Sequence, residues 1–346
     1  MTEINETLNG RINFAYVTSC REIGSDELVG RIVRDSMNGK NYGYREGCLE
    51  NLARRLGDGD NEFGRRFNLV AVIVDDDDEQ YKKAWSQAEI WPRNLDVPIR
   101  NNKGNIIAKP TLEQLTVRIP AQHWKDIRRA DSESAESFKA RKAEAKAMYE
   151  YEILGILRET NADLAISDSY MTIFGPLLLK AYGERILNIH PAITKIDDSD
   201  RLPGHTPTRD AYTRAVYGYL ITDDKKNPKH KPNGREDMVG YYKYNPDTKR
   251  VERELRKAVY VPKSNRTGVT VHIVSEDVDD GPVVKYLPYQ FNPNGVTPEA
   301  IRTMNYERKI ELLTQAMLEY VERPEVQILI AERRNHNNDS WSHIKR

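Results

Sequence analysis

The chain has 346 residues, with 53 basic and 53 acidic side chains and a formal net charge of +0 at pH 7. This balance creates no overall field that would attract nucleic acid or an anionic membrane, so neither is expected as a partner. Two cysteines, Cys20 and Cys48, are too few for a disulfide framework. The sequence shows neither a secretory signal pattern nor an apolar window of membrane-spanning length, so a cytoplasmic location is expected.

The first part of the chain predicts two buried strands. Residues 12–17 form a short β-prone run, and a turn-rich loop and a helix around Leu28, Ile32 and Val33 are expected to follow it. Residues 67–74 are apolar at nearly every position and are followed by four aspartates. This pattern is typical of a strand buried on both faces of a parallel sheet, so both strands are expected to be central.

Helices and strands alternate through the rest of the chain. A long helix rich in Ala, Glu and Lys is expected over 132–158, with its buried side formed by Met148, Ile153, Ile156 and Leu157. Further strands are expected over 163–167, 185–189, 268–274 and 283–286, and further helices over 174–182, 208–217 and 298–321. This alternation predicts an α/β, Rossmann-like fold, in which a mostly parallel twisted sheet carries helices on both faces.

Residues 223–266 interrupt the alternation with polar and tyrosine-rich sequence. An Asn-Pro-Asp turn in this block predicts a β-hairpin. We therefore interpret 223–266 as a surface insertion into a single α/β domain formed by 1–222 and 267–346. The basic residues Arg333 and Arg334 near the end of the chain are expected to lie in a solvated tail.

Two polar side chains occur where the strand over 185–189 ends. Asn188 and His190 are two residues apart, so both project from the same face of the strand. Sites in parallel sheets lie beyond the carboxyl ends of the strands. There an amide can donate a hydrogen bond to a developing oxyanion, and an imidazole can share that task or transfer a proton. The alternatives are that Asn188 caps a turn and that His190 only ends the strand.

An acidic loop follows the β-prone run over 268–274. It spans 277–282 and ends in Gly-Pro. If Asp279 approaches His190, its negative charge would hold the ring and favour the protonated imidazolium. The alternative is that the acidic side chains only solvate a turn.

Two other kinds of site have weaker support. A zinc site could be built from His190, His205, His272 and Asp279, but no pair of these residues has the compact spacing of ligands on a helix or a turn. A serine hydrolase would require a nucleophile elbow, and the sequence has no Gly-x-Ser-x-Gly motif. No metal is therefore expected.

Taken together, these fragments resemble the folate-dependent formyltransferase family, most closely the glycinamide ribonucleotide formyltransferases. The resemblance is carried, in the family's order, by residues 162–171, 188–191, 203–206 and 279–282. It implies that Asn188, His190 and Asp279 form the catalytic trio. It also implies that the formyl donor is 10-formyltetrahydrofolate and that the acceptor is a primary amine.

The same resemblance indicates which residues flank the pterin ring of the donor. They are Met171, Thr172, Ile173 and Phe174 on one side and Ser275, Glu276, Asp277, Val278 and Asp280 on the other. Thr172 stands where the family often has Arg, and Asp280 stands where it usually has Gly. The contacts made by these two positions are therefore expected to differ from those of the family.

The family holds the phosphate of the acceptor at the first loop, which here contains Gly24, Ser25 and Asp26. A carboxylate at this place can cap the helix itself and repel a phosphate. Glycinamide ribonucleotide is the default acceptor by resemblance, and an amino sugar nucleotide or another biosynthetic amine is the alternative.

Three functions stay open at this point. A formyltransferase is the main hypothesis, with a folate and a small-molecule amine as partners. A formyltetrahydrofolate hydrolase could use the same trio on water, and a non-catalytic folate-binding protein would keep only the crevice. The sequence also leaves open whether the protein forms a homodimer.

Overall fold

The structure is a computed structural model of the chain, and it describes residues 10–19, 31–34, 41–75, 95–168, 170, 172–204, 206–222, 236–245, 250–277 and 279–344. The chain groups into two compact units. The first unit comprises 1–189, 272–276 and 313–346, and the second comprises 190–271 and 277–312.

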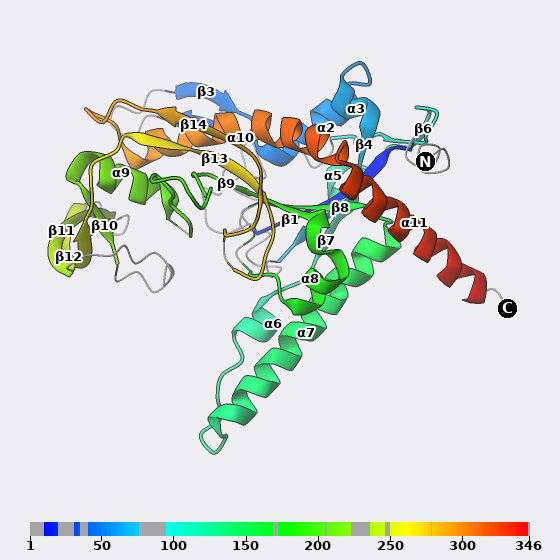
Figure 1. Cartoon of the computed structure of the whole chain (residues 1–346), viewed down its shortest axis with the longest axis horizontal. Helices are drawn as coiled ribbons and strands as arrows, with labels where there is room; N and C mark the ends of the chain where they lie inside the picture. Colours follow the sequence, from blue (N-terminus) through cyan, green and yellow to red (C-terminus); the bar gives the residue numbers. More distant parts are fainter. Residues whose placement is uncertain are drawn as a thin grey trace. The chain divides into compact units, whose positions relative to one another are not determined.

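A parallel sheet forms the core of the first unit (Figure 1). Its strands in spatial order are β9 (Ile186–His190), β8 (Leu164–Asp168), β1 (Ile12–Thr18), β4 (Phe67–Val74) and β7 (Thr116–Arg118). All of these neighbours pair in parallel. Nearly every residue of β1, β4 and β8 is buried, as expected of strands covered on both faces. The predicted fold class and the central position of the first two strands are therefore confirmed.

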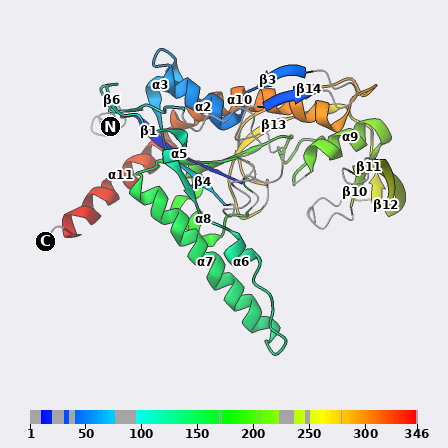
Figure 2. The same cartoon turned by 180° about the vertical axis from the view of Figure 1, so that it is seen from behind.

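The first unit also contains helices and two short strands that pair as a hairpin. They are α2 (Cys48–Gly57), α3 (Glu62–Arg66), β5 (Ile99–Arg100), β6 (Ile106–Ala108), α5 (Leu112–Leu115), α6 (Gln122–Lys125), α7 (Ala135–Glu159), α8 (Pro176–Tyr182), the short 3-10 helix η2 (Gly183–Arg185) and α11 (Pro324–Ile344). Figure 2 shows α7 and α8 side by side, with α6 next to α7. No helix among the residues described is long and apolar enough to cross a membrane.

The prediction of a helix around Ile32 and Val33 is wrong. Arg31–Arg34 instead form strand β2, which pairs antiparallel with β3 (Asn41–Arg45). Ile32 and Val33 are β-branched, so both favour an extended conformation over a helix. Leu28, the third position of that expectation, lies outside the described residues.

The first helix after this hairpin is α2, which was not predicted from the sequence. Its buried residues include Leu49, Leu52, Ala53 and Leu56. These positions have the spacing of one helix face, so the signal was present in the sequence.

The predicted long helix is confirmed as α7, but its buried face was partly misplaced. Ile153 and Leu157 are buried as expected, whereas Met148 is 59% exposed. The neighbouring Tyr149 is buried instead, and its hydroxyl forms a 2.6 Å hydrogen bond with the hydroxyl of Tyr170. The aromatic ring with a polar end fills this part of the core because its hydroxyl finds a partner.

The second unit contains a small antiparallel sheet of strands β10 (Tyr219–Ile221), β12 (Arg250–Tyr260) and β11 (Glu236–Asn245). Strands β11 and β12 pair as a hairpin with Asn245 opposite Arg250, and the Pro246 and Asp247 positions of the predicted Asn-Pro-Asp turn lie outside the described residues. The unit also holds α9 (Pro207–Tyr217), β13 (Arg266–Ile273), β14 (Val283–Gln290) and the first half of α10 (Pro298–Val321). The interpretation of 223–266 as an insertion remains a prediction.

The expectation of a solvated basic tail is wrong for Arg333 and Arg334. Both residues lie on α11, and both bind the buried carboxylate of Asp163. A buried acidic residue just before a strand requires a cationic partner, and the two arginines supply it.

Candidate active site

Asn188 lies in β9, beside Ser167 of β8, near the carboxyl ends of these strands. Its Nδ2 is 3.0 Å from Nε2 of His272, which is buried. The other ring nitrogen of His272, Nδ1, is 3.0 Å from the carbonyl oxygen of Ile273. A carbonyl can only accept, so in the neutral ring Nδ1 carries the proton and Nε2 accepts from the Asn188 amide. His272 therefore fixes which way this amide points.

His190 is the last residue of β9 and is only 7% exposed. Its Nδ1 lies 3.5 Å from Oδ1 of Asp279, and its Nε2 lies 3.3 Å from the carbonyl oxygen of Leu202. Both neighbours accept hydrogen bonds and neither can donate one when the Asp279 carboxyl is ionised. Each ring nitrogen of His190 therefore faces an oxygen acceptor.

The carboxylate of Asp279 is held by the backbone of a neighbouring loop. Its Oδ2 accepts a 2.8 Å hydrogen bond from the backbone N–H of Gly204. Asp279 itself has a φ of 55°, a left-handed conformation that a non-glycine residue adopts at a cost. Such a conformation persists only where surrounding contacts hold the residue, so we infer that these contacts fix the position of the Asp279 carboxylate.

Arg201 is one of these contacts. Its guanidinium donates to the Thr194 carbonyl at 3.0 Å, to the Asp279 carbonyl at 3.2 Å, and to the Asp280 carboxylate in an ion pair. The charge that Asp280 adds to this loop is therefore paired with Arg201. Arg201 thereby ties the acidic loop to the segment that follows β9.

The residues expected to flank a pterin are placed as follows. Thr172 is buried and donates a 2.8 Å hydrogen bond to Oδ2 of Asp75. Phe174 is buried and stacks on Tyr170, with ring centroids 4.7 Å apart. Ile173, between them, is 54% exposed and offers apolar surface.

In the acidic loop, Ser275 is partly buried, Glu276 and Asp277 are exposed, and Asp280 is partly buried. Met171, Val278 and His205 lie outside the described residues, as do Gly24, Ser25 and Asp26 of the expected acceptor loop. The assignment of all these residues to a binding site remains a prediction.

A buried carboxylate that the sequence analysis passed over lies at the end of β4. Asp75 follows Val74, and its Oδ2 is also 3.4 Å from Nζ of Lys125. Its Oδ1 is buried and accepts no hydrogen bond from the described residues. Nothing in the sequence singled out Asp75, because it is the first of four consecutive aspartates.

Comparison with known proteins relates part of the sequence and the fold to formyltransferases. Residues 105–211 match the family model described as formyl transferase. The fold is similar to that of PvdF of pyoverdin biosynthesis, described as an N10-formyltetrahydrofolate-dependent formyltransferase, with a TM-score of 0.61, 22% identity, and coverage of 89% of this chain and 100% of that one. The resemblance to formyltransferases that the motifs predicted is therefore confirmed, in sequence over 105–211 and in fold.

More distant solved structures are also formyl-handling enzymes. The phosphoribosylglycinamide formyltransferase from Streptococcus pneumoniae TIGR4 is 17% identical, with a TM-score of 0.43 and coverage of 88% of this chain and 96% of that one. The formyltetrahydrofolate deformylase from Burkholderia mallei ATCC 23344 is 15% identical, with a TM-score of 0.46 and coverage of 91% and 67%. No curated protein matches the chain.

Proposed function

We propose that the protein transfers a formyl group from 10-formyltetrahydrofolate to a primary amine. The observation that carries this proposal is the contact between His190 and Asp279, in a chain whose residues 105–211 match the formyl transferase model. An imidazole that ends a strand and faces a fixed carboxylate is suited to stabilise negative charge on an acyl oxygen. The donor is taken from the description of PvdF, which shares the fold.

In the proposed reaction the amine nitrogen attacks the formyl carbon, and the carbonyl oxygen becomes an oxyanion. The amide of Asn188 and the imidazolium of His190 donate hydrogen bonds to that oxygen. The bond from the formyl carbon to the donor nitrogen then breaks, releasing tetrahydrofolate and the formamide product. Asp279 keeps the imidazole charged and helps to pass the proton lost by the amine to the departing nitrogen. Nε2 of His190 faces the Leu202 carbonyl at 3.3 Å, so the proposed step requires its proton to turn toward the oxyanion.

The donor would bind beside Ile173, whose exposed side chain offers apolar contact to an aromatic ring. The Thr172 hydroxyl donates its hydrogen bond to Asp75, so in this proposal Thr172 orients the Asp75 carboxylate and does not bind the donor directly. The acceptor is proposed only as a primary amine. Glycinamide ribonucleotide, an amino sugar nucleotide and other biosynthetic amines are the candidates.

The proposal is tested by following tetrahydrofolate release from 10-formyltetrahydrofolate, with and without a panel of primary amines. Release that depends on one amine, together with its formylated product, is the expected result. Formate production in the absence of any amine would instead identify a hydrolase. Binding of the donor without its consumption under any condition would identify a folate-binding protein.

His272 is expected to act as a positioning residue for Asn188. Replacing His272 with Leu removes the acceptor for the Asn188 amide and should lower kcat by about tenfold, since one aligned hydrogen bond is lost. KM for the donor should stay nearly constant. The carboxamide of His272→Gln can restore the acceptor and should recover most of kcat. Equal loss in both variants, or a loss confined to KM, would contradict this role.

A further inference from the structure

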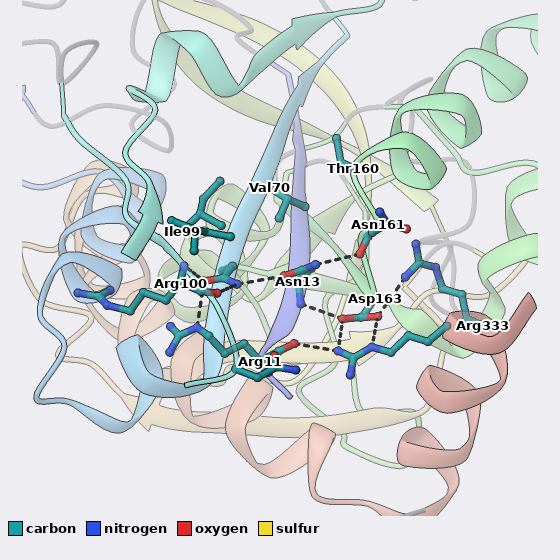
Figure 3. A pocket seen from close by; sticks show the side chains of 13 residues that line it. Arg11, Asn13, Val70, Ile99, Arg100, Thr160, Asn161, Asp163 and Arg333 are labelled. Atoms are coloured by element: carbon teal, nitrogen blue, oxygen red, sulfur yellow. Dashed lines mark hydrogen bonds and ion pairs between the residues drawn. The ribbon is translucent and has the colours of Figure 1, made fainter. Parts of the chain in front are cut away.

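A cavity lies at the amino-terminal edge of the sheet in the first unit (Figure 3). Its volume is about 640 Å³, within the range of small-molecule sites, and its lining includes residues at the starts of β1 and β4. Asn13 of this lining is separated by roughly 13 Å of strand from Val17. Val17 pairs with Ser167, the neighbour of Asn188. The cavity is therefore distinct from the region of Asn188.

The lining of this cavity is strongly basic. Among the described residues that form it, the charged ones are four arginines and one aspartate, namely Arg11, Arg100, Arg333, Arg334 and Asp163. Asp163 binds the two arginines of α11, with contacts of 3.0 Å to Arg333 and 2.7 Å to Arg334. Figure 3 shows Asp163 and Arg333 on one side of Asn13, and Arg11 and Arg100 on the other. The negative charge of Asp163 is therefore paired with the two arginines of α11.

Arg11 and Arg100 have only neutral acceptors in the described part of the chain. Arg11 is 8% exposed and donates to Oδ1 of Asn68 at 3.0 Å and to the carbonyl of Phe67 at 2.7 Å, and to two further backbone carbonyls. Arg100 donates to the carbonyl of Leu56 at 2.7 Å and to a second carbonyl next to it.

This arrangement is electrostatically unfavourable for Arg11. Burial, and then repulsion from Arg100, lower the pKa of Arg11 to about 10. A buried cation is normally matched by a carboxylate, because the hydrogen bonds of neutral groups do not cancel its charge. Among the described residues, none supplies a carboxylate to these two arginines, and the cavity beside them has room for a counter-charge.

We propose that this cavity binds a small polyvalent anion, up to the size of a mononucleotide. Arg11 contributes its positive charge, because its guanidinium already donates to Asn68 and to backbone carbonyls. The guanidinium of Arg100 can direct N–H donors at the oxygens of phosphate or carboxylate. The asparagines of the lining can hydrogen-bond to uncharged parts of such a ligand. Because the cavity lies at the opposite strand ends from Asn188, a bound anion would act on the stability of the first unit and not on the transferred formyl group.

The test measures binding to the full-length protein by isothermal titration calorimetry. The probes are inorganic pyrophosphate, adenosine monophosphate and citrate, with adenosine as the neutral comparison. At least one anion is expected to bind with one-to-one stoichiometry, and adenosine is not. Replacing Arg100 with Gln should weaken that anion by about tenfold or more, since a charge-assisted hydrogen bond is lost. Arg141→Gln is the matched control, because Arg141 pairs with Glu133 on the surface away from the cavity.

Binding of pyrophosphate or adenosine monophosphate would assign the site to a phosphate, and binding of citrate alone would assign it to a polycarboxylate. The proposal is overturned if none of the three anions binds, if adenosine binds as tightly as its monophosphate, or if Arg100→Gln binds like the wild type. A salt titration of the wild-type protein gives a second readout that needs no variant. The affinity must fall as sodium chloride is raised, because salt screens the attraction between the arginines and the anion.

Discussion

Replacing His190 with Ala is expected to lower kcat for formyl transfer by about 10³-fold or more. The ring is buried, faces the Asp279 carboxylate at 3.5 Å, and is proposed to stabilise the oxyanion of the tetrahedral intermediate. Groups with that role contribute factors of about 10²–10³ in kcat, and proton transfer adds to this. The measurement is the steady-state rate of tetrahydrofolate release with the amine identified in the panel.

The companion variants separate the role of the charge from that of the ring. Asp279→Asn keeps an oxygen that can accept from the N–H of Gly204, but it removes the negative charge beside His190. A large loss of kcat is expected here too. The double variant should be only slightly worse than His190→Ala, because residues that act as a unit have non-additive effects.

The control for this series is His123→Ala, which removes an exposed imidazole on α6. It should leave kcat unchanged. Full activity of His190→Ala, with a circular dichroism spectrum like that of the wild type, would remove the basis for placing the chemistry at this histidine.

The sequence predicted the central strands and the ends of β9 well, because each signal there is local. A run of apolar residues that ends in polar ones indicates a buried strand wherever it occurs, and β4 is an example. The expectation that Asn188 and His190 project from the same face depends only on strand geometry. These features could be predicted without knowing which segments pair.

Contacts between distant segments could not be predicted in the same way. His272 appeared in the sequence only as a candidate metal ligand, and its actual partner, the amide of Asn188, is 84 residues away. Nothing in the sequence indicated a role for Arg201, because an arginine after a strand is common and usually faces solvent. Its role depends on the loop around Asp280, which the fold brings next to it.

The prediction of a solvated tail at Arg333 and Arg334 was wrong for a related reason. A cluster of charges near a terminus usually faces solvent, and composition alone favours that interpretation. The buried Asp163 reverses it, because its carboxylate lies 170 residues before Arg333 and is reached only through the packing of α11. Because this ion pair is buried, removing it is expected to lower the free energy of unfolding substantially.

Replacing Asp163 with Asn is expected to lower the free energy of unfolding by about 3–5 kcal/mol, the usual cost of breaking a buried ion pair. Asp163 is 1% exposed and accepts hydrogen bonds from Arg333, Arg334 and the backbone N–H of Asn13. The amide that replaces it offers one acceptor oxygen and turns an NH₂ group toward a buried guanidinium. The measurement is urea unfolding followed by tryptophan fluorescence and circular dichroism.

Two further variants show whether the loss comes from the buried charge. Glu133→Gln breaks an ion pair with Arg141 that lies at the surface, and its effect should be much smaller because solvent screens that pair. Arg333→Met should cost less in the Asp163→Asn background than in the wild type, since it removes a cation that has already lost its partner. If Asp163→Asn unfolds at the same urea concentration as the wild type, the buried ion pair contributes little to the stability of this unit.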